Sequence, residues 1–219
     1  MELRQHFSAN MSQLYQNILR MGTMVEEALK KSLVAISNHD MELARQVIDE
    51  DIRIDEMQAR IEDQCALLIA TESPVASDLR EIITAVKIVS NIERIGDHAR
   101  HIARAVDKLK SPALLATVPK FRKLAELGIG MIHDAVTAFV EQDADRAREV
   151  ADRDDLIDDL HAELYREIVA IMTHDGTLVE EGITMTLLAR FMERLGDHVT
   201  NICEWIVFAK QGKHIELNS

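Results

Sequence analysis

The sequence has few of the residues that interrupt helices. It contains only 3 prolines and 8 glycines in 219 residues. Both residues disfavour a helix interior, so their scarcity allows long uninterrupted helices. Aromatic residues make up only 4% of the chain, whereas hydrophobic residues reach 47%. We therefore expect a core of Ala, Leu, Ile, Val and Met, which is typical of helix bundles rather than of sheets.

Other absent features indicate the compartment of the protein and the partners that it is not expected to bind. The chain begins without the apolar region of a signal peptide, and no apolar run approaches the ~18 residues of a membrane span. The 2 cysteines, Cys65 and Cys203, lie within apolar helical patterns and are expected to be buried thiols in a reducing compartment. The net charge is −13 and no dense Lys/Arg run interrupts it, which argues against nucleic acid as a partner. A cytoplasmic protein without membrane insertion is expected.

Two sequence patterns each occur twice in the chain. The pattern Val-x-x-x-Asp-x-x-Ile-Asp at Val47–Asp55 returns at Val150–Asp158. The pattern Glu-Arg-Ile-Gly-Asp-His at Glu93–His98 returns at Glu193–His198, with Leu in place of Ile. Both repeats keep the same order at nearly the same offset, which indicates an internal duplication.

Breaks in the helical pattern follow the same repeat. Asp40 and Asp143 each follow the end of one helical segment and are positioned to cap the next. The breaks separate six segments of about 28–35 residues, each with the apolar spacing of a helix. We predict an all-α protein of two pseudo-symmetric three-helix bundles, formed by residues 1–110 and 111–219.

Acidic residues occupy positions that the helical pattern reserves for apolar side chains. In the second segment, apolar residues recur at steps of three and four, and Asp51 takes one of these core-facing positions. Asp154 takes the matching position in the fifth segment, and Asp55 and Asp158 follow one turn later. Burying an unpaired carboxylate costs several kcal/mol per ion, so a positive partner is required.

The third and sixth segments repeat this intrusion with pairs of acids one turn apart. Glu93 and Asp97 share a helix face, as do Glu193 and Asp197. Like charges at this spacing cost an isolated helix ~0.2–0.5 kcal/mol. The sequence therefore predicts two carboxylate metal sites, one in each half. Their candidate ligands are Asp51, Asp55, Glu93 and Asp97 in the first half and Asp154, Asp158, Glu193 and Asp197 in the second.

Two kinds of positive partner remain open. Arg94, Arg194 and Arg100 lie beside the acids and could neutralise them through buried ion pairs. A cation could instead take several carboxylate oxygens at once, and ligands without thiolates favour magnesium, calcium, manganese or iron over soft metals. Glu27 and Asp134 would add a third helix to each site if the first helices of the two halves align.

Histidines and glycines accompany the acidic residues. His98 and His198 point ~100° away from the adjacent aspartates on a helical wheel, so we expect them at the surface or behind the ligands rather than as ligands themselves. His161 occupies a core-facing position, as either a buried core histidine or a ligand. Gly96 and Gly196 each cost a helix about 1 kcal/mol relative to Ala, which a close approach between helices would explain.

The chain resembles the PhoU family in several motifs. The resemblance rests on Glu93–Ala99, Glu193–His198 and Pro74–Arg80, together with both Asp-x-x-Ile-Asp stretches. It implies two three-helix bundles and multinuclear metal sites containing iron, zinc or lighter divalent ions such as manganese or magnesium. It also implies a negative regulator of the phosphate regulon, which couples the ATPase subunit of a phosphate ABC transporter to a sensor histidine kinase.

The resemblance leaves some alternatives and one departure. The second half has Gly176–Glu181 where the first half has Pro74–Arg80, so the two sites are expected to differ. We expect a homodimer. We also expect no catalytic activity, because no nucleophile set or phosphate-binding glycine loop is present. A carboxylate-bridged di-metal oxidase is the alternative enzyme, although such bundles use Glu-x-x-His rather than Glu-x-x-x-Asp. A metal-free scaffold with paired acids is the alternative binding protein.

Overall fold

The computed structural model describes residues 2–217, which form helices joined by short connections and contain no strand. The first half runs through α1 (Glu2–Asn38), α2 (Met41–Glu50), α3 (Ile52–Glu72) and α4 (Ala76–Ala105). The connection between the halves contains η1 (Val106–Lys108) and α5 (Pro112–Leu115). The second half runs through α6 (Val118–Glu141), α7 (Ala144–Ala151), α8 (Asp154–His174), η2 (Gly176–Leu178) and α9 (Val179–Gln211). The predicted all-α class is confirmed.

The break after the first helix has the same local structure in both halves. His39 and Gln142 adopt left-handed backbone conformations with φ of 52° and 54°, and these residues end α1 and α6. The side chains of Asp40 and Asp143 then each accept hydrogen bonds from the backbone N–H groups two and three residues ahead. These bonds satisfy donors that a helix start leaves unpaired, as the sequence predicted.

The second helix of each half is interrupted near its buried acid, which sequence periodicity did not predict. Between α2 and α3, Asp51 keeps a helical backbone, but its carbonyl accepts from the N–H groups of both Ile54 and Asp55, at 2.8 and 3.3 Å. Between α7 and α8, the carbonyl of Arg153 accepts from the N–H of Leu156 at 3.1 Å. Both turns are tightened only locally. The apolar pattern of the sequence therefore continues across the break and does not distinguish two helices from one.

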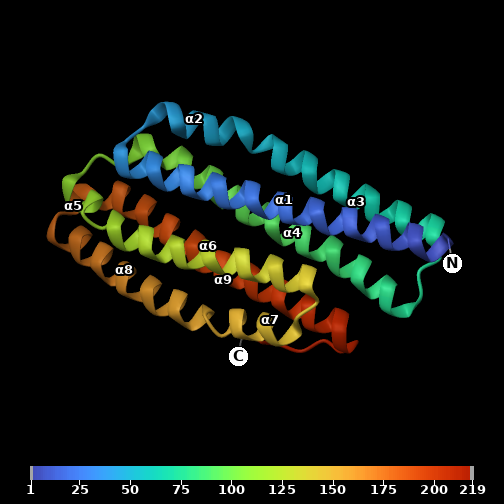
Figure 1. Cartoon of the computed structure of the whole chain (residues 1–219). Coiled ribbons are helices and arrows are strands. Elements are labelled where there is room, and N and C mark those ends of the chain that lie inside the picture. Colours follow the sequence, from blue (N-terminus) through green and yellow to red (C-terminus); the bar gives the residue numbers. More distant parts are fainter. Residues whose placement is uncertain (1, 218–219) are drawn as a thin grey trace.

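The long helices lie alongside one another in two groups. Figure 1 shows α1, α3 and α4 together on one side of the molecule and α6, α8 and α9 together on the other. The groups meet mainly where α4 packs against α9 and where α1 packs against α6. Across residues 2–217, no helix combines the length and the apolar character needed to cross a bilayer.

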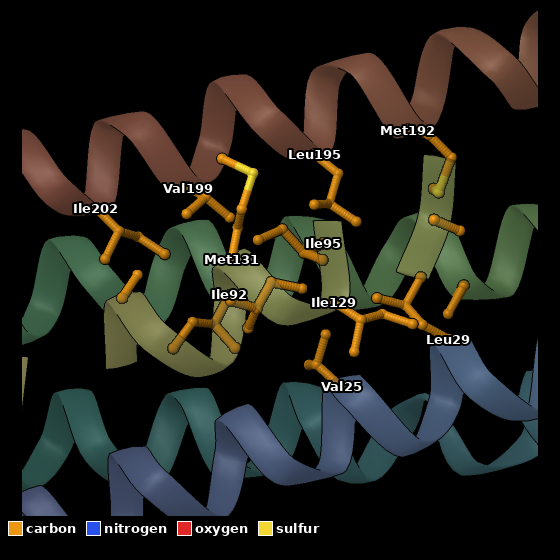
Figure 2. Packing of buried hydrophobic residues seen from close by; sticks show 14 of the residues in the cluster. Val25, Leu29, Ile92, Ile95, Ile129, Met131, Met192, Leu195, Val199 and Ile202 are labelled. Carbon is orange, nitrogen blue, oxygen red and sulfur yellow. The ribbon is translucent and has the colours of Figure 1, made fainter. Parts of the chain in front are cut away.

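Both halves contribute to one hydrophobic core. Figure 2 shows side chains of α1, α4, α6 and α9 pointing toward one another at the centre of the molecule. The labelled side chains are Val25, Leu29, Ile92, Ile95, Ile129, Met131, Met192, Leu195, Val199 and Ile202. The two cysteine thiols are also buried, as predicted. Because the halves share this core, separating them would expose apolar surface of both.

Candidate functional site

In the first half, an arginine stands between two of the predicted acids. The antiparallel packing of α3 and α4 brings Asp51, at the start of α3, beside Arg100, near the end of α4. The guanidinium of Arg100 forms ion pairs with both Asp51 and Asp97. Asp51 is only 6% exposed, so this arginine neutralises a carboxylate that water barely reaches.

The four acids of the first half lie within electrostatic range of one another. Burial raises the pKa of Glu93, and the negative charges of Asp97, Asp55 and Asp51 raise it further. Burial also raises the pKa of Asp51, although the positive charge of Arg100 opposes this shift. The raised pKa values of Glu93 and Asp51 show that this region favours additional positive charge.

In the second half, the position of Asp154 requires a glycine on the neighbouring helix. Asp154 is 3% exposed and lies against Gly196, where an added Cβ would come within 2.0 Å of its Oδ1 atom. In the first half, the Cβ of an alanine at Gly96 would instead meet Ile54 at 3.2 Å. The close helix approach predicted at both glycines is therefore observed.

The remaining acids of the second half surround a partly satisfied glutamate. One carboxylate oxygen of Glu193 pairs with Arg190, whereas Oε2 is buried and has no hydrogen-bond partner among residues 2–217. Burial raises the pKa of Glu193, and the charges of Asp197 and Asp158 raise it further. Sequence reasoning missed the Arg190–Glu193 pair, although their three-residue spacing on one helix could have indicated it.

The two halves differ at the position of the bridging arginine. The residue that matches Arg100 in the repeat is Thr200, whose buried hydroxyl has no hydrogen-bond partner in the described part of the chain. Neither Arg94 nor Arg194 forms an ion pair with an acid within residues 2–217. Of the three arginines that the sequence offered as partners, only Arg100 lies between two acids within residues 2–217, and it belongs to the first half.

The surroundings of the acids differ between the halves in the same way. Among residues 2–217, no three His, Cys, Asp or Glu side chains are arranged so that they could hold a metal ion as they stand. In the first half, Arg100 already fills the space between Asp51 and Asp97. In the second half, Oε2 of Glu193 has no hydrogen-bond partner within residues 2–217, and Asp197 and Asp158 lie near enough for their charges to raise the pKa of Glu193 beyond the effect of burial.

His98 does not lie at the surface, which was one of its two predicted positions. His98 is 7% exposed and stacks on Phe191 of α9, with ring centroids 5.1 Å apart, and its ring lies 5.8 Å from that of His198. Burial lowers the pKa of His98 to about 3, and nearby basic side chains make smaller contributions in the same direction. A wheel drawn for α4 alone could not include α9, which covers this face.

Two further candidates have other partners. Asp134 pairs with Arg146 and Arg153, at 3.0 and 2.7 Å, so it does not join the carboxylates of the second half. His161 is half-buried near Arg190 and Asp158, and burial lowers its pKa. A neutral imidazole remains compatible with either of the roles considered for His161.

Comparison with known proteins connects this arrangement to a family. The family model described as PhoU domain matches the chain twice, at residues 18–106 and 121–206. The chain belongs to the PhoU family. The phosphate-specific transport system accessory protein PhoU homolog of Clostridium acetobutylicum is 36% identical over 216 residues, covering 98% of this chain and 99% of that relative.

Other PhoU proteins match over most of their length. The phosphate-specific transport system accessory protein PhoU of Escherichia coli is 31% identical over 207 residues, covering 94% of this chain and 86% of that protein. The crystal structure of PhoU from Pseudomonas aeruginosa has a TM-score of 0.86 and 32% identity, covering 94% of this chain and all of that one. The PhoU structure from Streptococcus pneumoniae has a TM-score of 0.87 and 31% identity, covering 95% and 99%. The predicted membership of the PhoU family is confirmed.

Proposed function

We propose that this protein is an accessory regulator of phosphate transport. It binds the ATPase subunit of a phosphate ABC transporter and a sensor histidine kinase, and it represses phosphate-starvation genes when phosphate is plentiful. The observation that carries the proposal is the near full-length similarity to relatives named as accessory proteins of phosphate-specific transport. Because both partners present their regulatory parts inside the cell, the proposal places the protein in the cytoplasm.

The protein acts by binding rather than by catalysis. The names of its relatives describe an accessory role, and the repeated acids lie in or next to the long helices of the bundle. The alternative di-metal oxidase would need histidine ligands beside its glutamates. His98 instead lies against Phe191 at the contact between α4 and α9. The active form is a homodimer, for which light scattering should give twice the mass of the chain.

Each half also carries a cation-binding site, and the two sites differ in strength. The second-half site uses Glu193 and Asp197 of α9 with Asp154 and Asp158 of α8. Hard cations such as magnesium, manganese or iron suit these oxygen donors, with zinc as a further candidate. A bound cation would supply positive charge to the acids. The first-half site is weaker, because a cation there must displace Arg100 from Asp51 and Asp97.

Metal analysis of matched variants tests the sites. Glu193→Gln with Asp197→Asn should remove most of the bound metal, measured by mass spectrometry of the purified protein. Glu93→Gln with Asp97→Asn should remove little, because Arg100 already neutralises that half. Equal metal content in wild type and both variants would show that the acids hold no cation and would support the metal-free scaffold.

Binding to the partners tests the function directly. The wild-type protein should form a stoichiometric complex with the purified ATPase subunit of the phosphate transporter, measured by size-exclusion chromatography. Deleting the gene should release phosphate-starvation genes from repression in phosphate-rich medium. Unchanged repression after deletion would contradict the regulatory role, and robust turnover of a phosphoester by metal-loaded protein would contradict the absence of catalysis.

A further inference from the structure

A cavity of about 370 Å³ lies where the two halves meet. Its walls come from the first turns of α4, the end of α6 and the last turns of α9. Three of the α4 residues, Ser77, Asp78 and Arg80, belong to the Pro74–Arg80 motif, which no part of the proposed function uses. The volume lies near the lower end of the ~300–1,000 Å³ range of small-molecule sites, so a small metabolite is the appropriate size of ligand.

Charged side chains of both signs face this cavity. Asp78 and Glu81 supply negative charge from α4, while Arg80 and Lys210 supply positive charge from α4 and α9. None of these four side chains forms an ion pair within 4 Å with another among residues 2–217. Opposite charges therefore line the cavity without direct ion pairs between them.

Neutral groups hold two of the charges in place. Arg80 donates from Nε to the carbonyl of Ala209 in the last turn of α9, at 3.4 Å. Glu81 accepts a hydrogen bond from the amide of Gln142, which also donates to the hydroxyl of Tyr15 at 3.1 Å. Burial raises the pKa of both Glu81 and Tyr15. These contacts join α1, α4 and the end of α6 around the cavity, so its charges are positioned before any ligand binds.

We propose that this cavity binds a small zwitterion of the α-amino acid type. The carboxylate of the ligand faces Arg80 and Lys210, and its ammonium group faces Asp78 and Glu81. Phe139 supplies part of an apolar wall against which the ligand's side chain packs. An anion alone would leave both acids without an oppositely charged partner in contact, and a cation alone would do the same to both bases, whereas a zwitterion pairs all four.

The second half does not repeat this arrangement. The residue that matches Glu81 in the repeat is Glu181, and its carboxylate accepts from the backbone N–H groups of Lys110 and Ser111, at 2.7 and 2.8 Å. One site per chain follows. Glu81 and Glu93 are separated along α4 by roughly 18 Å. The site is therefore distinct from the repeated carboxylates, and its ligand would contact both halves at once.

A thermal-shift screen of the full chain against each of the common amino acids is the first test. At least one amino acid should raise the Tm, by roughly 3–6 °C at about ten times its Kd. Calorimetry with that amino acid should then give one site per chain. If none of them raises the Tm or gives binding heat, the proposal is wrong.

Matched variants distinguish a zwitterion from other ligands. Lys210→Gln and Asp78→Asn should each weaken binding at least tenfold, because each removes one charged partner. Lys213→Gln and Glu180→Gln change exposed residues outside the cavity and should leave the Kd unchanged. Retained affinity in both cavity variants would overturn the proposal.

Inorganic phosphate and AMP serve as anionic probes. Neither should compete with the amino acid in the calorimeter. Binding of either probe that depends on Lys210 but not on Asp78 would identify an anion site instead, and would overturn the zwitterion. Complex formation with the transporter ATPase subunit is measured separately on the same variants. Failure of ligand binding is thus distinguishable from failure of the proposed function.

Discussion

Replacing Arg100 with methionine tests whether an internal cation holds the first half together. The substitution Arg100→Met keeps much of the apolar stem and removes the guanidinium that pairs with Asp51 and Asp97. Asp51, at 6% exposure, would then be a buried carboxylate beside other acids. The folded state of the variant should therefore lose free energy relative to the unfolded chain.

The expected loss can be estimated from the burial of the partners. Removing one partner of a fully buried ion pair costs ~3–5 kcal/mol. The side chains of Arg100 and Asp97 are 25% and 32% exposed, so water offsets part of this cost. We expect a loss of about 2–4 kcal/mol in urea denaturation. For a protein of this size, the same loss lowers the Tm by roughly 4–16 °C.

A second substitution separates loss of charge pairing from loss of packing. Adding Asp51→Asn to Arg100→Met removes the uncompensated charge and should recover at least half of the lost stability. Arg166→Met provides the control, because Arg166 is an exposed arginine that donates only to a carbonyl of its own helix. If the double variant is no more stable than Arg100→Met, packing rather than charge explains the effect, and the reasoning fails.

Further substitutions and one chemical modification have predictable outcomes. Gly196→Ala should destabilise the protein in urea by roughly 1–3 kcal/mol, because its Cβ would clash with Asp154. In Gly130→Ala, the added methyl group would point into open space, so the substitution should stabilise the helix by about 0.5–1 kcal/mol. His98→Phe should leave the protein at least ~1 kcal/mol more stable than His198→Phe at pH 8, because only His198 has a hydrogen-bonded ring. The two thiols, whose pKa burial raises to about 12, should resist a thiol reagent at pH 8 until the chain unfolds.

Each of these expectations has a contradicting result. Equal stability of the two glycine variants would show that Asp154 can move without cost. Greater stability of His198→Phe than of His98→Phe would mean that the ring nitrogens of His98 are satisfied in solution.

Because the unfolded thiols ionise near pH ~8.5 and the folded thiols only near 12, stability should fall as pH rises above that lower value. Rapid labelling of the folded protein would contradict the buried position of the thiols.

Patterns within single helices predicted much of this structure. The apolar spacing located the long helices, and the aspartates that follow α1 and α6 located two helix starts. The scarcity of glycine made Gly96 and Gly196 conspicuous, and both lie at close helix contacts. These features depend on neighbours within a few residues or on one packing partner, so sequence spacing contains the necessary information.

Features that depend on several helices were not accessible in the same way. The burial of His98 depends on α9, which is almost 100 residues away along the chain. The pairing of Arg100 with Asp51 depends on the register between α3 and α4. Sequence spacing left Arg94, Arg100 and Arg194 as equivalent candidates, because a helical wheel does not show which arginine reaches across to the next helix.

The differences between the halves bear on how a duplicated protein could respond to a signal. Arg100 is permanently charged and covalently part of the chain, so the first half carries its cation under all conditions. Thr200 supplies no charge at the matching position, and Glu193 keeps a buried oxygen without a partner within residues 2–217. Under the proposed function, the second half would then respond to lower concentrations of a free cation than the first half. A duplication that placed Arg at both positions would weaken metal binding in both halves. Thr200→Arg is therefore expected to reduce metal binding while preserving the fold.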